Sequence, residues 1–352
     1  MIYAINVRKD TTIYENNLIL NTGDDEVLEI SKALYPTTNS RILLQFDMDT
    51  VSESIASGEY TGSAFFLKLN ATSPMEVPLE YTLMANAISG SWESGVGSFY
   101  NVTSSVLESS WKWRDSSNEW ATSSYAVNTT GSYTTYPGGA TWYTSSVASQ
   151  SFSYGPSDLR MNITNIAHDW ISGSIPNEGI VIRRTVADEE SDLLKGSLKF
   201  FSKNTNTIYQ PKLQIAWDDS IYSTGSLQEL TAEDIVVYPK SVKAQYQTNS
   251  KGKFRIVGRE RYPVKTFATS SSYRDVKYLP QTTYYSIQDS ITEEQVISFD
   301  DIYTKVSCDT TGNYFNLWTG QFAVERWYNV NIKVVRDGAV QIFEAGSFKV
   351  VR

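Results

Sequence analysis

In Tyr328-Asn-Val-Asn-Ile-Lys-Val-Val-Arg-Asp-Gly-Ala-Val-Gln-Ile-Phe343, apolar residues alternate with polar ones on both sides of an Asp-Gly pair. Val330, Ile332 and Val334 alternate before the pair, and Val340 and Ile342 alternate after it. A period of two predicts strands, and Asp-Gly between two such runs is typical of a tight two-residue hairpin turn. The stretch therefore predicts an antiparallel β-hairpin.

The same alternation recurs along the rest of the 352-residue chain. It predicts strands at 42–46, 65–69, 77–83, 179–183, 198–201 and 213–217, and then at 234–238, 253–257, 283–287, 295–299, 328–335, 339–343 and 347–351. The 23 Tyr and 9 Trp residues, among many Ser, Thr and Asn, also favour strands over helices. We therefore expect an all-β protein.

One segment departs from this pattern, at residues 162–173. Ile163, Ile166 and Trp170 recur at helical spacing there, Thr164 can cap the start, and Gly173 can end the helix. This predicts one short helix within the β protein.

A polar, turn-rich run at residues 218–226 follows the last clear strand of the first region. We place a domain boundary there, with one domain at 1–219 and a second at 220–352. Residues 89–153 are rich in Ser, Gly, Tyr and Trp, which predicts long aromatic loops on the first domain. The closing strands are similar to an immunoglobulin-like sandwich, and whether 225–352 forms one domain or two stays open.

Charge and composition exclude several classes of partner. A formal charge of −9 and a pI near 4.9 oppose binding to nucleic acid phosphates. No run approaches the roughly 20 apolar residues that span a bilayer, and the start lacks the pattern of a signal peptide. Cys308 is the only cysteine, which excludes an intrachain disulfide and fits assembly in a reducing compartment.

Catalytic chemistry has weak candidates. His168 is the only histidine, and its neighbour Asp169 would project about 100° away around a helix. We interpret Cys308 as a buried apolar residue. Acidic pairs such as Glu93 with Asp115 are expected by chance among 39 acidic residues, and no calcium-loop or zinc-ligand spacing is present. We predict no catalytic residue, no metal and no cofactor.

Two groups of residues are candidates for binding. Exposed aromatic side chains in sandwich loops can stack on sugars, which makes Trp111, Trp113 and Trp142 candidate glycan ligands, with structural packing as the alternative. Residues 240–261 hold seven basic residues against one acid. They form either a docking patch for an acidic subunit or a solvated strand edge that resists aggregation. The seven are Lys240, Lys243, Lys251, Lys253, Arg255, Arg259 and Arg261.

An ordered series of motifs lies between residues 10 and 219. Ser40-Arg-Ile-Leu-Leu-Gln-Phe-Asp-Met48 comes after Asn21-Thr-Gly23 and before Ser91-Trp-Glu-Ser-Gly-Val-Gly97. Pro137-Gly-Gly139, residues 161–173 with Pro176-Asn-Glu-Gly179, and the pair 198–202 and 210–218 complete the series. The series resembles DNRLRE-type β-sandwich modules, which are jelly-roll-like domains related to carbohydrate-binding modules and found in surface and phage proteins. Ala140 departs from the acidic residue usual at that point.

The resemblance implies a jelly-roll-like β-sandwich over about 60% of the chain. Modules of this type usually sit in exported wall proteins, behind a leader and ahead of an anchor, and neither is recognisable here. We therefore expect a non-enzymatic structural protein of a tailed-phage virion, in its tail, baseplate, neck or capsid surface. It would be present in repeated copies and bound to other virion proteins. The alternatives are an adhesion module for a host-surface glycan and, less favoured, a polysaccharide-degrading enzyme.

Overall fold

The protein is all-β, as its alternating sequence predicts. The structure, a computed structural model, describes residues 1–34, 37–49, 51, 62–100, 108–120, 138–154, 158–263 and 276–352. In these residues strands dominate, beside the short α-helices α2 (Thr164–Ile171) and α3 (Val186–Glu189) and the 3₁₀ helix η3 (Thr319–Gln321). Helix α3 was not predicted.

The chain divides into two compact units. The N-terminal unit contains most of residues 4–215, and the C-terminal unit contains Ala216–Arg352 together with Met1–Tyr3. The predicted boundary after residue 219 lies four residues from this division, and Met1–Tyr3 belong to the unit that is remote from them in sequence.

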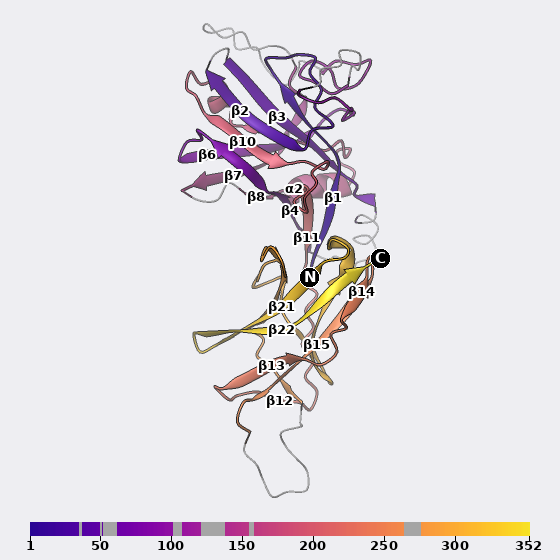
Figure 1. Ribbon diagram of the computed structural model, residues 1–352, viewed down its shortest axis with the longest axis vertical. Helices are drawn as coiled ribbons and strands as arrows, with labels where there is room; N and C mark the ends of the chain where they lie inside the picture. Colours follow the sequence, from indigo (N-terminus) through magenta and orange to yellow (C-terminus); the bar gives the residue numbers. More distant parts are fainter. Residues whose placement is uncertain are drawn as a thin grey trace, which may run out of the picture. The chain divides into compact units, whose positions relative to one another are not determined.

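The N-terminal unit is built on one eleven-stranded sheet system (Figure 1). Its strands are β1 (Ile2–Tyr14), β2 (Val27–Leu34), β3 (Thr37–Phe46), β4 (Ala64–Leu69), β5 (Ala71–Met75), β6 (Glu80–Ile88), β7 (Trp142–Ser153), β8 (Leu159–Asn162), β9 (Ile180–Arg184), β10 (Gly196–Phe201) and β11 (Lys212–Ala216). β3 is central, because it pairs antiparallel with β1 along one edge and with β2 and then β9 along the other. Its Ile42, Leu43 and Leu44 are fully buried as a result.

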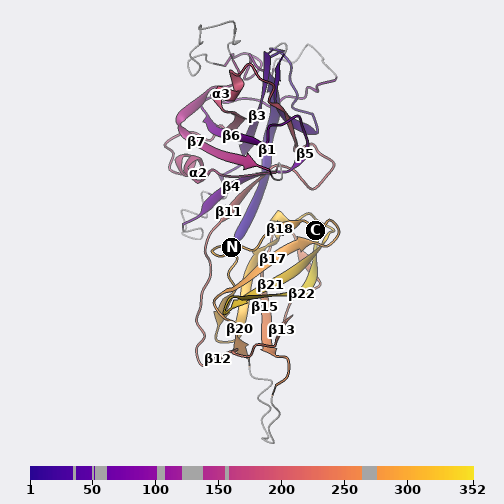
Figure 2. The ribbon, with the colours of Figure 1, turned by 90° about the vertical axis from the view of Figure 1, so that its left-hand side faces the viewer.

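The helix α2 confirms the prediction for 162–173, with Ile166 and Trp170 buried and Gly173 ending it at φ +72°. It lies against β7 (Figure 2). The predicted cap is wrong, because the Thr164 hydroxyl accepts from the Phe65 N–H at 3.0 Å instead of from its own helix. Asn162 Oδ1 accepts from the Thr164 N–H at 3.0 Å.

The prediction of long loops at 89–153 is wrong for the end of this segment, which is a strand. Trp142 opens the twelve-residue strand β7, which pairs with β6 over most of its length. The Ser and Thr residues of this strand gave a turn-like pattern, yet all of them except the buried Ser146 occupy exposed positions of a half-buried strand. Residues 101–107 and 121–137 lie outside the described part of the chain.

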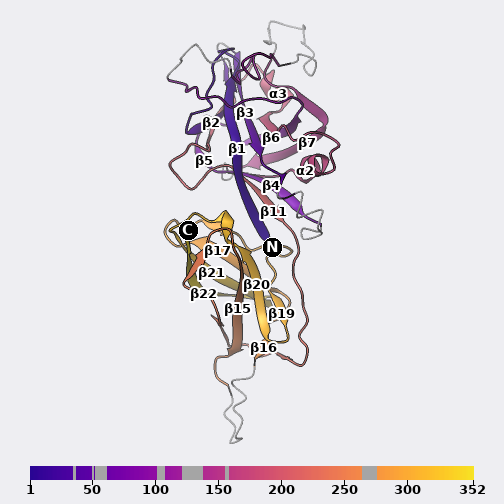
Figure 3. The same ribbon diagram turned by 90° about the vertical axis from the view of Figure 1, so that its right-hand side faces the viewer.

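The C-terminal unit consists of two sheets, of six and five strands (Figure 3). The first holds β12 (Gln228–Glu229), β13 (Ile235–Pro239), β15 (Lys251–Glu260), β16 (Lys277–Tyr278), β19 (Ser307–Asp309) and β20 (Gly312–Trp318). The second holds β14 (Gln245–Gln247), β17 (Thr283–Asp289), β18 (Gln295–Ile297), β21 (Trp327–Arg336) and β22 (Ala339–Val351).

Aromatic rings join these two sheets face to face. Tyr285 of β17 stacks on Phe315 of β20 with ring centroids 4.2 Å apart, and Phe254 of β15 meets Phe348 of β22 at 5.2 Å. Such contacts across two inner faces are the core of a β-sandwich. Residues 216–352 therefore share one core, in a single compact unit.

The predicted hairpin is confirmed. Arg336 pairs with Ala339 across a two-residue turn, and both Asp337 (φ +47°) and Gly338 (φ +81°) adopt the left-handed region of a type I′ turn. The predicted strands 339–343 and 347–351 are one strand, β22, with a register shift near Gly346.

Candidate functional site

The motif residues of the N-terminal unit meet in space, where they bind backbone groups of the loops. Asn21 Nδ2 donates to the carbonyls of Ser94 and Ser109, both at 2.8 Å, and its Oδ1 accepts from the Gly97 N–H at 2.8 Å. One buried amide thus ties two loops to the segment that follows β1. Because the buried amide is already hydrogen-bonded on both sides, its role is structural.

Arg41 is the centre of a second cluster. Its Nε and Nη2 each donate to a Glu189 carboxylate oxygen at 2.9 Å, and its Nη1 donates to the Gly139 carbonyl. The guanidinium carbon also lies 4.7 Å from the Trp111 ring centroid and 5.2 Å from that of Trp142. The bidentate ion pair is buried on both sides, at 3% exposure for each side chain.

This cluster changes the interpretation of two candidate glycan ligands. Trp111 and Trp142 are 2% and 6% exposed and belong to a core cluster with Trp92 and Trp120. Stacking on a sugar requires an accessible ring face, which neither residue offers. Trp111 and Trp142 are therefore core residues, and the alternative of structural packing describes them correctly.

Trp113 is different, since its side chain is half-buried at the surface. Lys112 Nζ lies 5.2 Å from its ring centroid and also pairs with Glu119 at 3.0 Å. Its role as a glycan ligand stays a prediction. The neighbouring loop also exposes Phe99 and Tyr100, at 42% and 94%.

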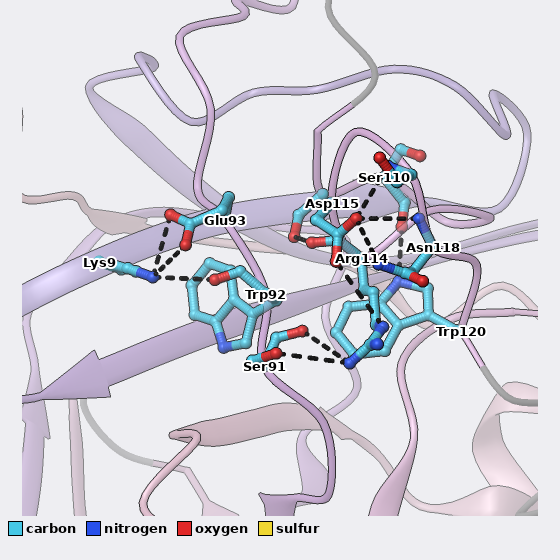
Figure 4. Close-up of polar contacts among 11 residues, drawn as sticks. Lys9, Ser91, Trp92, Glu93, Ser110, Arg114, Asp115, Asn118 and Trp120 are labelled. Carbon is cyan, nitrogen blue, oxygen red and sulfur yellow. Dashed lines mark hydrogen bonds and ion pairs between the residues drawn. The ribbon is translucent and has the colours of Figure 1, made fainter.

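Glu93 and Asp115 lie on adjacent loop segments, because the Glu93 N–H donates to the Arg114 carbonyl. Figure 4 shows Glu93 beside Lys9, and Asp115 beside Asn118. Glu93 pairs with Lys9 Nζ at 3.0 Å. The Asp115 carboxylate accepts from the Asn118 side chain and from the Ser117 and Asn118 N–H groups, and these bonds lower its pKa. A general acid needs a raised pKa, so Asp115 is suited to closing its own turn.

Neither candidate nucleophile system is assembled. The His168 ring is exposed and meets Phe65 edge-on at 6.1 Å, while the neighbouring Asp169 accepts from the Ser146 hydroxyl at 2.6 Å. Burial raises the pKa of the Cys308 thiol to about 11, which keeps it protonated at neutral pH. In the part of the chain that the structure describes, no group of three His, Cys, Asp or Glu residues could hold a metal.

The basic run of residues 240–261 forms a surface on the six-stranded sheet. Lys251, Lys253, Arg255 and Arg259 alternate along β15 with buried Gly252, Phe254, Ile256 and Gly258. Strand alternation therefore places the four cations in one row on the side of the sheet away from the core. Lys240 joins this row, because its N–H donates to the Arg255 carbonyl at 2.8 Å. We call this row, with Arg261 at its end, the cationic face.

Besides Lys240, two more of the seven basic residues lie outside β15. Arg261 follows the strand in the same alternation and is exposed. Lys243 is also exposed, but its N–H donates to the Tyr246 hydroxyl in the turn before β14. Lys243 is therefore not included in the cationic face.

Asp309 organises the middle of the cationic face, and its part was not foreseen from the sequence. Both Asp309 oxygens accept from Arg255, at 3.0 and 2.7 Å, and Lys253 Nζ lies 3.0 Å from Oδ2. These donors, the Arg255 guanidinium above all, hold the pKa of Asp309 well below its usual range. Lys253 also lies 3.6 Å above the Tyr314 ring, so the centre of the face is rigidly held.

Several cations of the face lie outside the Asp309 cluster. In the described residues, no acidic side chain forms an ion pair with Lys240, Arg259 or Arg261. Lys251 lies 5.3 Å above the Trp318 ring and is exposed. Tyr238, 39% exposed, adds an aromatic side chain on the neighbouring strand, where β13 places it opposite Val257 of β15. The surface combines a fixed centre with the exposed cations Lys240, Arg259 and Arg261.

Comparison with known proteins identifies no family. No family model matches the chain, and no curated protein matches it. Among solved structures, the chain shows a weak similarity to the apo structure of Bacteroides uniformis beta-glucuronidase 3, at 7% identity and a TM-score of 0.18. The match covers 88% of this chain and 26% of that chain, so it spans about a quarter of the neighbour's length. At this score the similarity identifies neither a shared fold nor a shared activity. No helix in the described residues is long and apolar enough to cross a membrane.

Proposed function

We propose that this protein is a non-enzymatic structural component of a tailed-phage virion that binds neighbouring subunits through the cationic face. The observation that carries the proposal is the row of cations along β15, held on a rigid sheet by the Arg255 pair with Asp309. A preformed β surface with fixed charges loses little conformational entropy when it docks. Complementary charge then sets the orientation and the encounter rate of the partner.

We also propose a specific sandwich type for each unit. The N-terminal unit would be a jelly-roll-like sandwich with aromatic loops, and the C-terminal unit an immunoglobulin-like docking domain. The virion assignment rests on the resemblance of residues 10–219 to modules of surface and phage proteins, and on an all-β chain whose single thiol is buried. Repeated copies around a symmetry axis are expected for such a component.

The test is to purify particles from the source and measure the chain by quantitative mass spectrometry. Stoichiometric presence in virions is the expected result. A reconstitution with Lys251→Glu and Arg259→Glu should then reduce incorporation, whereas Arg8→Glu with Arg352→Glu, two exposed cations outside the cationic face, should not. Absence of the chain from particles would contradict the proposal.

A second candidate is a carbohydrate-binding adhesion module. It is favoured by Phe99 and Tyr100, whose exposed rings lie in contact with each other at 5.3 Å between centroids, and by the half-buried Trp113. Retention of the chain on a glycan array, lost in Tyr100→Ala and Trp113→Ala but kept in the buried-tyrosine variant Tyr328→Phe, would favour it over the virion role.

A further inference from the structure

The charge of the chain is divided unequally between its two units. Residues 1–215 contain 14 Lys and Arg against 23 Asp and Glu, whereas residues 216–352 contain 16 of each. The whole formal charge of −9 therefore belongs to the N-terminal unit. The C-terminal unit is neutral overall but concentrates its positive charge on the cationic face.

Asp24-Asp25-Glu26, between β1 and β2, is a run of three consecutive acidic residues. In the other such run, residues 188–190, Asp188 pairs with Lys195 and Glu189 with Arg41. Asp24 and Glu26 are exposed, and their carboxylates accept from the Asn204 and Asn206 side chains at 3.2 and 2.9 Å. These are neutral donors, so the negative charges are oriented without being cancelled.

An aromatic pair adjoins this run. The Asp25 carboxylate accepts from the Phe99 N–H at 3.2 Å, and the Gly97 carbonyl accepts from the Asp24 N–H at 2.9 Å. Phe99 and Tyr100 are thereby held beside the carboxylates with their rings exposed. We call this group, Asp24, Asp25, Glu26, Phe99 and Tyr100, the acidic tip.

We infer that the acidic tip of one copy docks on the cationic face of a second copy. Carboxylates suit the exposed Lys240, Arg259 and Arg261, and exposed aromatic rings accept Lys and Arg cations over their faces. After docking, the first copy retains an unused cationic face and the second copy an unused acidic tip. Such a head-to-tail contact generates closed rings or open filaments.

This inference rests on the proposed function, because it uses the same cationic face and names its partner as a second copy of the chain. It also explains why one face of a strongly acidic protein should be basic. Charges that only prevent a strand edge from pairing with another chain can be scattered. They need not form an ordered row opposite in sign to the rest of the chain.

The test is sedimentation velocity of the full chain at low and raised salt. The wild-type chain should self-associate at about 20 mM salt, and association should weaken at least roughly tenfold at about 300 mM, where exposed charges are screened. Lys251→Glu with Arg259→Glu, and separately Asp24→Lys with Glu26→Lys, should each weaken self-association roughly tenfold or more. Arg8→Glu with Arg352→Glu is the control and should not.

Mixing the two reversed variants gives the sharpest result. In each variant alone, the tip and the face carry charge of the same sign and repel each other. In the mixture, the tip of either variant can dock on the face of the other, which has the opposite sign. An equimolar mixture should therefore recover association to within about threefold of wild type. A misfolded variant could not recover in this way. A monomeric wild-type chain at low salt, or association that both reversals leave unchanged, would overturn the inference.

The two proposals fail in different ways. If virions incorporate the wild-type chain but not the Lys251→Glu, Arg259→Glu variant, while the purified chain never self-associates, the partner is another subunit and only the inference is overturned. If the chain self-associates as expected but is absent from virions, the inference stands and the virion role is overturned.

Discussion

The two units differ in what fills their interiors. Among the described residues, the N-terminal unit buries seven charged side chains and the C-terminal unit only Asp289. The seven are Asp10, Glu15, Lys32, Arg41, Arg183, Arg184 and Glu189. The C-terminal interior instead contains stacked rings, centred on Phe254, Phe315 and Phe348. One β architecture is thus stabilised mainly by specific ionic and polar partners, and the other mainly by apolar volume.

Long connections explain the difference. In the N-terminal unit, the described parts of the connection between β6 and β7 (residues 89–100, 108–120 and 138–141) lie outside the named strands, so their backbone lacks the partners that a sheet supplies. Asn21 and Arg41 supply hydrogen bonds to those backbone groups. The C-terminal unit contains mostly short connections, such as the Asp337-Gly338 turn, so its interior can be apolar.

The largest expected effect is in the aromatic core. Phe254→Ala removes a fully buried ring that contacts Tyr246, Phe315 and Phe348, and should lower the free energy of unfolding of the C-terminal unit by about 4 kcal/mol. Hydrogen exchange measured by mass spectrometry assigns the loss to one unit. Tyr262→Ala, an exposed aromatic of the same unit, should change little. Equal loss of protection in both units would contradict the assignment of this effect to the C-terminal unit.

Breaking the buried ion pair comes next. Glu189→Gln leaves the Arg41 guanidinium buried without its counter-charge, which should destabilise the N-terminal unit by about 3 kcal/mol. Urea unfolding followed by exchange in that unit measures this. The matched control is Glu93→Gln, which breaks the more exposed pair with Lys9 and should cost below about 1 kcal/mol. Similar costs for the two variants would show that burial of the pair does not matter.

A smaller effect, opposite in sign, is expected at Asp10. Burial raises its pKa from 3.8 to about 6, so the folded chain holds the proton more tightly than the unfolded chain. Its contribution to stability is greatest below about pH 4, falls as the pH rises to about 6, and is then constant. Asp10→Asn should therefore stabilise the N-terminal unit at pH 7 by about 2 kcal/mol, and the gain should vanish near pH 4.

The measurement for Asp10 is urea unfolding at several pH values between 4 and 8. Asn can still accept from the Lys203 N–H that Asp10 binds at 2.6 Å. Glu80→Gln, at an exposed acid of the same unit, is the control and should leave the profile unchanged. Destabilisation by Asp10→Asn at pH 7 would show that the ionised carboxylate is favourable where it lies.

The smallest effect is expected at the hairpin turn. Gly338 has φ +81°, and a Cβ there would meet no atom within 4 Å, so only backbone strain opposes a substitution. Gly338→Ala should cost about 1 kcal/mol in the C-terminal unit, and Gly338→Asn less, because Asn tolerates the left-handed region. Thermal unfolding of both variants tests this, and equal costs would indicate that strain is not the cause.

Much of the fold could be predicted because alternation reports burial directly. Phe65, Leu67 and Leu69 were expected to face one side of a strand, and all three are fully buried. Helix α3 was missed, although a signal existed, since Thr185 lies three residues before Asp188 and accepts from its N–H. With four residues, α3 is too short for a periodic pattern to identify it.

The candidate site was less predictable, because it depends on contacts between distant residues. Trp111 and Trp142 are covered through Arg41, whose partner Glu189 is 148 residues away. The basic run was visible in the sequence, but its pairing with Asp309, 54 residues from Arg255, depends on the register of β15, β20 and β19. Strand register is a property of the folded chain and leaves no local signal.

The buried thiol has a practical consequence. With the pKa of Cys308 at about 11, about one molecule in ten thousand carries a thiolate at pH 7, and the sulfur is buried as well. A cysteine introduced at an exposed position, such as Lys251, Glu26 or Ser116, would therefore react with maleimide while Cys308 stays almost unlabelled. Comparing labelling rates in dilute and assembled protein would reveal, one residue at a time, which parts of the surface other molecules cover.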